Sequence, residues 1–340
     1  MSEAISGAFS LNIAKEEPLN ILVTGGAGFI GSHACKALAA EGYTPISYDN
    51  LSRGNRWAVK WGPLEEGNIS DKPRLKAVLQ KYQPAALMHF AAYAYVGESV
   101  QLPLMYYENN FSGTAALMHA LLDYQCVPVV FSSSCATYGT PDNVPIREDH
   151  PQRPINPYGR SKLFVENLLR DINESNGLPF VSLRYFNAAG ADPDGTIGES
   201  HDPETHLIPL ALISAKMGAP LRVFGTDYDT PDGTCVRDFI HVSDIADAHV
   251  RALNHLLRGG ESCALNLANS RGFSVREVIA TAERVTGRAI HQELVARRPG
   301  DPAVLVGDST RCHALLGWTP SRSDLETQIT DAWNWIKRSD

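Results

Sequence analysis

The sequence predicts an α/β protein built on a doubly wound parallel sheet, followed by a smaller α/β lobe. Three observations carry this prediction. Short apolar runs alternate with helical patterns through the first half of the chain, and a glycine-rich turn joins the first run to the first helix. The alternation stops after about Asn187, where a stretch rich in Gly, Asp and Pro begins. Buried strands separated by helices form parallel sheets covered on both faces, and right-handed crossovers wind them in both directions.

The strands of the first half are short and apolar, which is typical of a sheet that is buried on both faces. We expect strands at 20–24, 45–49, 86–92, 128–134 and 180–186. Helical periodicity fills the intervals, with helices at 28–41, from about 72, at 104–124 and at 158–176. Strands that alternate with helices in this way indicate crossover units, so we expect the strands to run parallel.

In the second half of the sequence, the residue pattern predicts a loop at 188–206 followed by shorter helices and strands. We expect helices near 208–217, 243–257, 274–286 and 323–337, and strands near 221–224 and 237–241. We therefore expect residues 20–187 to form a cofactor-binding domain and residues 188–340 a substrate lobe, partly interleaved with it. The lobe is expected over the carboxyl ends of the strands, where ligands bind in such folds. Residues 1–19 are expected to form a flexible arm.

The composition restricts the cellular compartment and the classes of binding partner that we expect for this protein. The 340 residues carry a formal net charge of -8, whereas a nucleic-acid-binding face would be basic. No stretch of 18 apolar residues could span a membrane, and residues 1–19 lack the pattern of a signal peptide. The six cysteines lie far apart, without a Cys/His cluster at metal-ligand spacing. We therefore expect reduced thiols, no metal site and a cytoplasmic protein that binds a small molecule.

The stretch ILVTGGAGFIGS at 21–32 predicts a dinucleotide-binding loop. Its glycines, Gly25, Gly28 and Gly31, permit a tight turn, close approach of the backbone to a pyrophosphate, and close packing of helix on strand. The helix that follows presents unpaired amides to the phosphates. Asp49 ends the second strand 18 residues after Gly31, where a carboxylate accepts hydrogen bonds from a ribose diol. Because a 2′-phosphate would repel Asp49, the pattern favours NAD over NADP.

The stretch NPYGRSK at 156–162 predicts a helix start that carries a proton-transfer pair. Asn156 and Pro157 form an N-cap followed by proline at the first helical position. Tyr158 and Lys162 then lie one turn apart on one face, and a cation one turn away lowers the pKa of a phenol. Ser134 ends the buried run PVVFSSS, at the sheet edge where the cofactor is expected. Its hydroxyl can share a substrate proton with Tyr158.

These motifs together resemble the extended short-chain dehydrogenase/reductase family, which has a Rossmann fold, and within it the UDP-sugar 4-epimerases. The resemblance runs from about Leu19 to Trp335. It rests on VTGGAGFIGSH, YDNLSRG, HFAAYAYVGESV, YYENNFSGT, FSSSCATYG, NPYGRSK, LRYFNAAGADPDG, GTDYDTPDGTCVRDFIHVSDIADAH and RRPGD.

The resemblance implies interconversion of UDP-glucose and UDP-galactose through a 4-keto sugar, with tightly bound NAD. In this reading Tyr158 takes the proton of the sugar 4-hydroxyl, Lys162 holds the nicotinamide ribose, and Ser134 assists. The implied cofactor contacts are Gly25, Gly28, Phe29, Ile30, Gly31, Asp49, Asn50, Asn68, Ile69, Phe90, Ala91, Ala92, Asn109, Ser132, Tyr158, Lys162 and Tyr185. The implied substrate contacts are Ser134, Tyr158, Asn187, His206, Leu207, Val223, Phe224, Arg237, Arg298 and Asp301.

Alternatives within and outside this family differ at identifiable residues. The stretches NPYGRSK, SSSCATYG and GTCVRDF also resemble those of UDP-xylose/UDP-arabinose 4-epimerases. Leu305 falls at a position that, in the family, determines how large a sugar substituent the pocket accepts. A nucleotide-sugar 4,6-dehydratase would need an Asp-Glu pair after Ser134, where Cys135 and Ala136 stand. A net reductase would consume free cofactor, and a non-enzymatic NAD-binding sensor would typically lack the Tyr or the Lys. The resemblance also implies a homodimer through the helices at 104–124 and 158–176.

Overall fold

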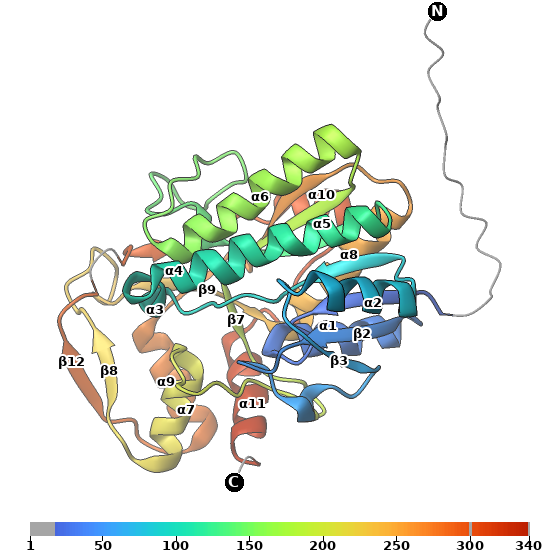
Figure 1. The fold of residues 1–340 in the computed structure, drawn as a ribbon. Coiled ribbons are helices and arrows are strands. Elements are labelled where there is room, and N and C mark those ends of the chain that lie inside the picture. Colours follow the sequence, from blue (N-terminus) through green and yellow to red (C-terminus); the bar gives the residue numbers. More distant parts are fainter. Residues whose placement is uncertain (1–17, 299–300, 339–340) are drawn as a thin grey trace, which may run out of the picture.

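A seven-stranded parallel sheet forms the centre of the molecule (Figure 1). The computed structural model describes residues 18–298 and 301–338. The expected arm at 1–19 therefore lies, except for its last two residues, outside the described residues. The strands are β1 (Asn20–Thr24), β2 (Thr44–Asp49), β3 (Leu64–Glu66), β4 (Ala86–His89), β5 (Val129–Ser134), β6 (Phe180–Tyr185) and β10 (Cys263–Leu267), in the order β10-β6-β5-β4-β1-β2-β3. All neighbours pair in parallel, which confirms the doubly wound sheet.

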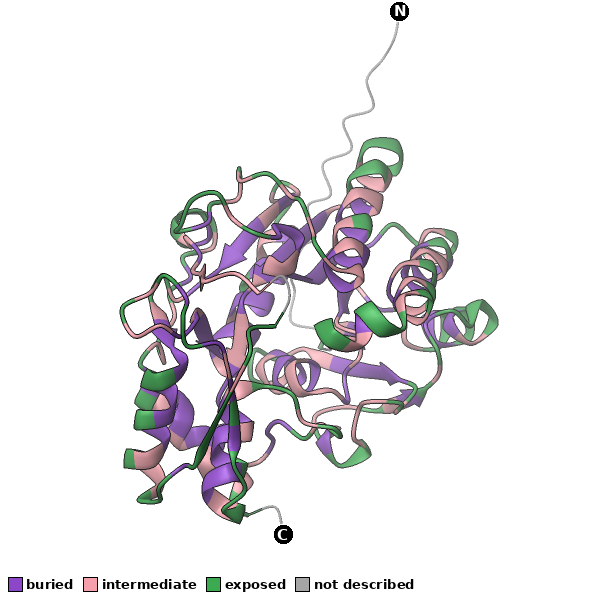
Figure 2. Cartoon of the chain, turned by 90° about the vertical axis from the view of Figure 1, so that its left-hand side faces the viewer, coloured by how far each residue is buried: buried purple, intermediate pink, exposed green. Residues whose placement is uncertain are grey.

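Helices cover both faces of this sheet, and the strands are buried between them (Figure 2). Helices α1 (Phe29–Ala40) and α8 (Val242–Leu257) pack on one face. Helices α2 (Lys72–Tyr82), α5 (Thr114–Tyr124) and α6 (Pro157–Asn176) pack on the other. Within β1, Val23 joins the first core and Leu22 the second, because successive side chains of a strand point to opposite faces. Burial on both faces explains why the strands read as continuous apolar runs.

The helical pattern predicted at 104–124 is interrupted in the structure. After α3 (Val96–Gln101) come α4 (Pro103–Tyr106), the π-helical segment η2 (Tyr107–Gly113) and α5. The side chain of Asn110 is buried and bonds both the backbone N–H and the carbonyl of Tyr93, at 2.8 and 2.9 Å. Thr114 Oγ1 donates to the Asn110 carbonyl at 2.6 Å. These side-chain bonds replace part of the regular α-helical pattern, and π-helical turns of this kind are frequent at functional sites.

The second lobe packs three helices, α7 (Leu207–Met217), α9 (Val275–Thr286) and α11 (Leu325–Ile336), around its own core. Its strands are β7 (Asn187–Ala189), β8 (Leu221–Phe224), β9 (Val236–His241), β11 (Gly272–Ser274), β12 (Gln292–Val295) and β13 (Val304–Leu305). The remaining elements are α10 (Thr310–Leu316), η1 (Arg56–Ala58) and η3 (Cys135–Thr137). The sequence analysis missed β3, β7, β10 to β13, α3 and α10, all of them short. Strand β10 pairs with β6, so the second half of the chain completes the first sheet.

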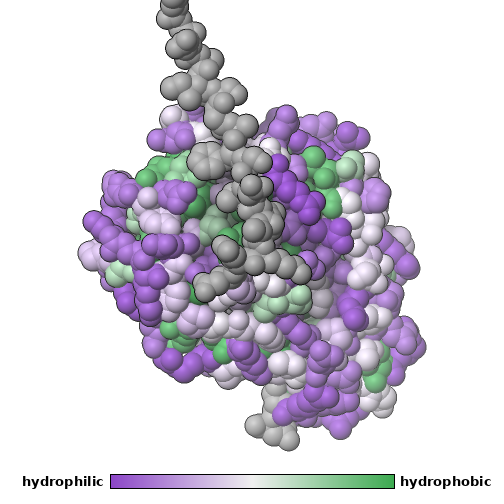
Figure 3. Space-filling model, turned by 90° about the vertical axis from the view of Figure 1, so that its right-hand side faces the viewer, coloured by the Kyte–Doolittle hydropathy of each residue, from purple (hydrophilic) through white to green (hydrophobic). Residues whose placement is uncertain are grey.

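The described surface is largely polar on the face that Figure 3 draws. Among the residues that the structure describes, no helix combines the length and the apolar composition that crossing a bilayer requires.

Candidate functional site

The carboxyl ends of the parallel strands bring the predicted site residues to one edge of the sheet. Gly25 follows β1, Asp49 ends β2, Phe90 follows β4, Ser134 ends β5 and Tyr185 ends β6. Strands β2 and β3 are added on one side of β1, whereas β4, β5 and β6 are added on the other side. The point between β1 and β4, where the order reverses, is the switch point at which ligands bind in open α/β sheets. The edge therefore gathers residues that are far apart in the chain.

The glycine-rich loop is shaped by close backbone contacts. Gly25 has φ +73°, and a Cβ there would lie 2.6 Å from the backbone nitrogen of Ala91. A Cβ on Gly31 would lie 2.1 Å from the Gly25 carbonyl oxygen, so α1 can approach β1 only without a side chain. Gly28 is the N-cap of α1 and supplies no side-chain cap, and Phe29 and Ile30 open the first turn. The helix start therefore offers amides to an anion, which fits the pyrophosphate of a dinucleotide.

Asp49 is buried and oriented by the backbone. Its Oδ2 accepts from the Ala27 N–H at 3.0 Å and its Oδ1 from the Leu51 N–H at 2.8 Å. Burial raises the pKa of Asp49, and these two hydrogen bonds oppose the rise. A carboxylate has about four acceptor positions, so each oxygen keeps a lone pair for a ribose hydroxyl. Asn50 lies exposed beside it.

The other predicted cofactor residues lie around the same edge. Asn68 and Ile69 follow β3, and the Asn68 side-chain oxygen accepts from the Ser70 N–H at 3.0 Å. Ala91 and Ala92 lie with Phe90 in the loop after β4. Asn109 lies in η2, and its Nδ2 donates to Asn110 at 2.9 Å. The side chain of Ile69 is buried in the core on the α2 face of the sheet.

The start of α6 is as the sequence predicts. Asn156 Oδ1 accepts from the Gly159 N–H at 2.8 Å, and Pro157 occupies the first helical position. Tyr158 and Lys162 are both buried on the side of the helix that faces β5. Lys162 Nζ donates to the Ser132 carbonyl at 2.7 Å and lies 5.9 Å from the centre of the Tyr158 ring. The helix start and β5 thus bring the predicted Ser, Tyr and Lys together.

Burial shifts the pKa values of this cluster in the direction that favours the neutral forms. It raises the pKa of Tyr158 to about 12, and a hydrogen bond with Ser134 partly opposes this. It lowers the pKa of Lys162 to about 7. Tyr185 also has a raised pKa because of burial, and its hydroxyl lies 2.5 Å from Ser132 Oγ. Added positive charge in this site would favour the phenolate of Tyr158.

A buried ion pair holds α6 against β5 and β6. Arg184 of β6 binds Glu166 of α6 through two hydrogen bonds of 2.9 and 2.6 Å, and Ser133 of β5 donates to the same carboxylate. Tyr138 accepts a further hydrogen bond from Arg184 at 2.8 Å. Glu166 lies one turn after Lys162 on the same helix. The sequence analysis did not identify this pair, because nothing local links two residues on different elements.

The predicted substrate residues of the second lobe lie on β8, β9 and the segment between β12 and β13. Arg237 of β9 makes an ion pair with Asp301, and Arg298 places its guanidinium 3.9 Å over the Phe224 ring. Strand β13 pairs Leu305 with Arg237, and Leu305 packs in the same cluster as Cys135, the neighbour of Ser134. The side chain of Val223 is buried in the core of the lobe, which leaves its main chain for a ligand.

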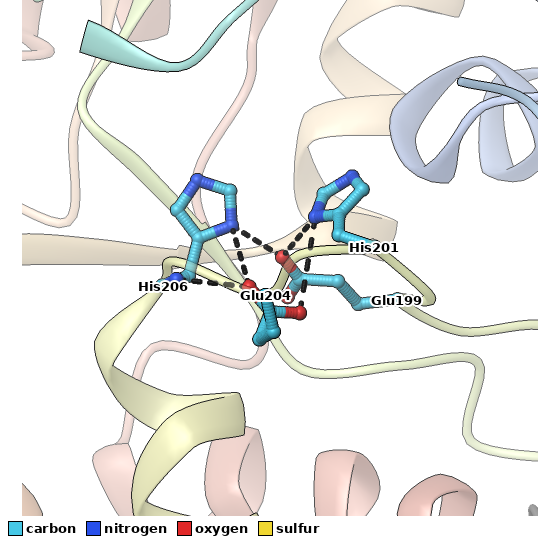
Figure 4. A group of neighbouring side chains, drawn as sticks. All are labelled: Glu199, His201, Glu204 and His206. Atoms are coloured by element: carbon cyan, nitrogen blue, oxygen red, sulfur yellow. Dashed lines mark hydrogen bonds and ion pairs between the residues drawn. The ribbon is translucent and has the colours of Figure 1, made fainter. Parts of the chain in front are cut away.

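The other predicted substrate residues lie in and around the loop before α7. Asn187 Nδ2 donates to the Asp238 carbonyl at 2.9 Å. Leu207 is the first residue of α7, and His206 is its N-cap. The imidazole of His206 contacts Glu199, within a group that also contains His201 and Glu204 (Figure 4). The sequence analysis missed this group, although the pattern E-x-H-x-x-E-x-H in ESHDPETH at 199–206 was a usable signal.

The fold and the site define a dinucleotide-binding α/β enzyme of the NAD type, with a Ser, Tyr and Lys cluster at the carboxyl edge of the sheet. Comparison with known proteins agrees: residues 21–268 match the NAD dependent epimerase/dehydratase family, and the chain belongs to it. The chain is 54% identical to a UDP-glucose 4-epimerase of Rhizobium meliloti (strain 1021) over 94% of this chain and 97% of that protein.

Two solved structures are similar over nearly their whole length. The UDP-glucose 4-epimerase from Brucella ovis in complex with NAD has a TM-score of 0.91 and 52% identity, covering 93% of this chain and 97% of that chain. The UDP-glucose-4-epimerase from Stenotrophomonas maltophila with bound NAD and formylated UDP-arabinopyranose has a TM-score of 0.90 and 40% identity, covering 95% and 100%.

Replacing Glu166 by Gln is expected to destabilise the protein by about 3 kcal/mol or more, because it leaves the Arg184 charge buried without its partner. The free energy of urea-induced unfolding measures this. The matched control is Glu326→Gln, which breaks an exposed ion pair with Arg284 and should cost about 0.5 kcal/mol or less. Equal losses in the two variants would show that the buried pair does not hold α6 in place.

Proposed function

We propose that the protein is a UDP-glucose 4-epimerase that interconverts UDP-glucose and UDP-galactose with bound NAD. The observation that carries the proposal is the cluster of Ser134, Tyr158 and Lys162 at the sheet edge, beside a glycine loop and an acid that fit a dinucleotide. The proposal is supported by the name of the relative that is 54% identical over nearly the whole chain. Complexes with NAD among the similar structures support the cofactor.

The roles of the catalytic residues follow from their positions. Tyr158 removes the proton of the sugar 4-hydroxyl, and Ser134 shares that proton through the hydrogen bond that it makes with the phenol. Lys162, when protonated, lowers the pKa of Tyr158 and binds the ribose next to the nicotinamide. NAD, held by the glycine loop and Asp49, would supply the hydride acceptor and donor that inversion at C4 needs. Tyr158 then gives its proton back to the new alcohol.

The second lobe anchors the nucleotide end of the substrate. Arg237 and Arg298 provide two guanidinium groups for the diphosphate, because their planar donors match phosphate oxygens in pairs. Asp301 holds Arg237 in place through an ion pair. The other substrate contacts we propose are Asn187, His206, Leu207, Val223 and Phe224.

The domain arrangement and the compartment belong to the same proposal. Residues 20–187 act as the NAD-binding domain, and 188–340 as the substrate lobe, with β10 and α8 interleaved into the first. A cytoplasmic location fits the six cysteines, all of which are free thiols.

A panel of UDP-sugars tests the function and ranks the substrates. UDP-glucose, UDP-galactose, UDP-xylose, UDP-arabinose and UDP-N-acetylglucosamine are incubated with the enzyme without added NAD, and products are followed by proton NMR. We expect inversion at C4 of UDP-glucose without net NADH. The pentoses are included because a similar structure carries formylated UDP-arabinopyranose. Faster turnover of the pentoses would assign the alternative substrate class, and loss of water would indicate a dehydratase.

Tyr158→Phe is expected to reduce kcat by about 10³-fold, within the range of general acid–base catalysis, while UDP still binds. Turnover is measured by NMR and UDP affinity by calorimetry. Tyr124→Phe, at the far end of α5, is the control and should keep full activity. Turnover of Tyr158→Phe within about threefold of the wild type would contradict the role of this phenol.

We also propose a homodimer that buries the apolar residues exposed on α3, α4 and α6. Val100, Leu104 and Phe164 are 62%, 72% and 41% exposed, and α3 packs against α6. Leu104→Asp is expected to give a monomer in size-exclusion chromatography with light scattering, because a buried unpaired charge opposes association. Met217→Asp, equally exposed at 72% on α7, should leave the dimer intact. A monomeric wild type would refute the proposal.

A further inference from the structure

Four potential metal ligands converge in the loop that precedes α7. Glu199, His201, Glu204 and His206 each offer one nitrogen or oxygen, and these four atoms lie within 4.8 Å of one another (Figure 4). Figure 4 shows both imidazoles turned toward the two carboxylates. The spacing in the sequence, with two His and two Glu in eight residues, makes this convergence a local property of the loop.

The separations fit four-coordinate binding of one small cation. Ligands bound tetrahedrally to Zn²⁺ at about 2.0–2.1 Å lie about 3.3 Å apart. His201 Nδ1 lies 3.0 Å from Glu199 Oε1 and 3.9 Å from Glu204 Oε2, and His206 Nδ1 lies 3.6 Å from Glu204 Oε1. His206 Nδ1 is in contact with Glu199 Oε1. These separations lie on both sides of the tetrahedral value, and the two imidazoles face different oxygens of Glu204.

The loop is held in position by contacts from distant parts of the chain. Trp335 Nε1 donates to the Glu199 carbonyl at 2.8 Å, and Asn55 Nδ2 donates to the Ser200 carbonyl at 3.3 Å. The His201 ring makes edge contacts with Tyr95 and Phe29. Orientation of metal ligands by such outer contacts is a common feature of metal sites. The ligand group is therefore arranged before any ion binds.

One imidazole nitrogen has no hydrogen bond of its own. His201 Nδ1 is buried and, within the described part of the chain, lacks a partner at hydrogen-bond geometry, although Glu199 Oε1 is 3.0 Å away. Instead it faces the space between the two carboxylates (Figure 4). A nitrogen held 3.0 and 3.9 Å from two carboxylate oxygens, without a hydrogen bond of regular geometry, is placed as a metal ligand would be.

We propose that Glu199, His201, Glu204 and His206 bind one divalent transition-metal ion, with Zn²⁺ the best match. Two imidazole nitrogens favour zinc over Mg²⁺ or Ca²⁺, which prefer oxygen ligands. The two carboxylates balance the charge of the ion. The partly exposed imidazole of His206 gives the ion an entry path, since its side chain is 45% exposed.

The bound ion ties the loop to the start of α7. His206 is the N-cap of α7, and His201 contacts Phe29 at the start of α1. The ion therefore links the second lobe to the glycine-loop helix and stabilises their contact. The site shares His206 with the proposed substrate contacts, so direct measurement of Zn²⁺ binding, apart from turnover, distinguishes failure of the metal site from failure of the epimerase function.

The alternative is a cluster without metal, in which protons on the imidazoles balance the carboxylates. Burial lowers the pKa of His201, but Glu199 and Glu204 outweigh it and raise the pKa to about 9. Burial raises the pKa of Glu199, but the two imidazoles outweigh it and lower the pKa to about 2. Such a cluster would need no ion, and the experiment must separate the two states.

The test uses the full chain after dialysis against a chelator and then against buffer at pH 7.5. ZnCl2 is titrated by calorimetry, Co²⁺ absorption reports the coordination, and thermal unfolding is followed with and without Zn²⁺. We expect one ion per chain with Kd below about 1 μM, tetrahedral Co²⁺ bands, and a Tm raised by about 3 °C or more with excess ion. These results would not occur for a proton-balanced cluster.

His201→Ala and, separately, Glu204→Gln should weaken Zn²⁺ binding by about 100-fold or more, because each removes a ligand. Glu204→Gln is the gentler change, since the amide oxygen can still accept from the Thr205 and His206 N–H groups. His119→Ala is the matched control: it removes an exposed His that pairs with Asp123, and it should bind as the wild type does. Wild-type Kd above about 100 μM, or equal binding by all variants, would overturn the proposal.

Discussion

The buried pair of Glu166 and Arg184 is the interaction on which the geometry of the site depends. It joins α6 to β6, and Ser133 on β5 donates to the same carboxylate. Lys162 lies one turn before Glu166 on α6, and Ser132 and Ser134 flank Ser133 on β5. A shift of α6 along the sheet, which would carry Lys162 with it, is therefore opposed by this network. The charge pair has no direct part in the proposed chemistry, but it sets the relative position of the groups that do.

Burial of the same region also sets the protonation of Tyr158 and Lys162. Tyr158 and Lys162 lie in a site that favours their neutral forms, with pKa values of about 12 and about 7. A buried charge is costly unless an opposite charge or hydrogen bonds compensate it. In the proposed function, the positive charge of an oxidised nicotinamide would compensate a phenolate and so favour proton transfer to Tyr158's partner groups. This coupling gives a physical reason for an enzyme of this design to keep its cofactor bound.

The sequence predicted what local patterns determine. The N-cap of α6, the glycine loop and the polar residues at strand ends each depend on a few neighbouring residues, and the structure has them where they were expected. It did not predict interactions between distant segments. Glu166 and Arg184 belong to different elements, and β10 joins the sheet through β6, although 77 residues lie between the two strands. The π-helical turn in η2 depends on Tyr93, in another loop.

The sugar end and the nucleotide end of the proposed site differ in a way that suits epimerisation. Arg237 and Arg298 on the second lobe offer charged, directional contacts for a diphosphate, whereas Cys135, Phe186 and Leu305 near Ser134 present apolar surfaces. A sugar ring held by apolar contacts loses little when it turns, because such contacts are not directional. Hydrogen bonds that fixed one orientation would oppose the turn that lets hydride return to the other face. The loop at 199–206, held by Asn55 and Trp335, lies where the two lobes meet. Epimerisation at the proposed site therefore needs both firm binding of the nucleotide and non-directional contacts around the sugar.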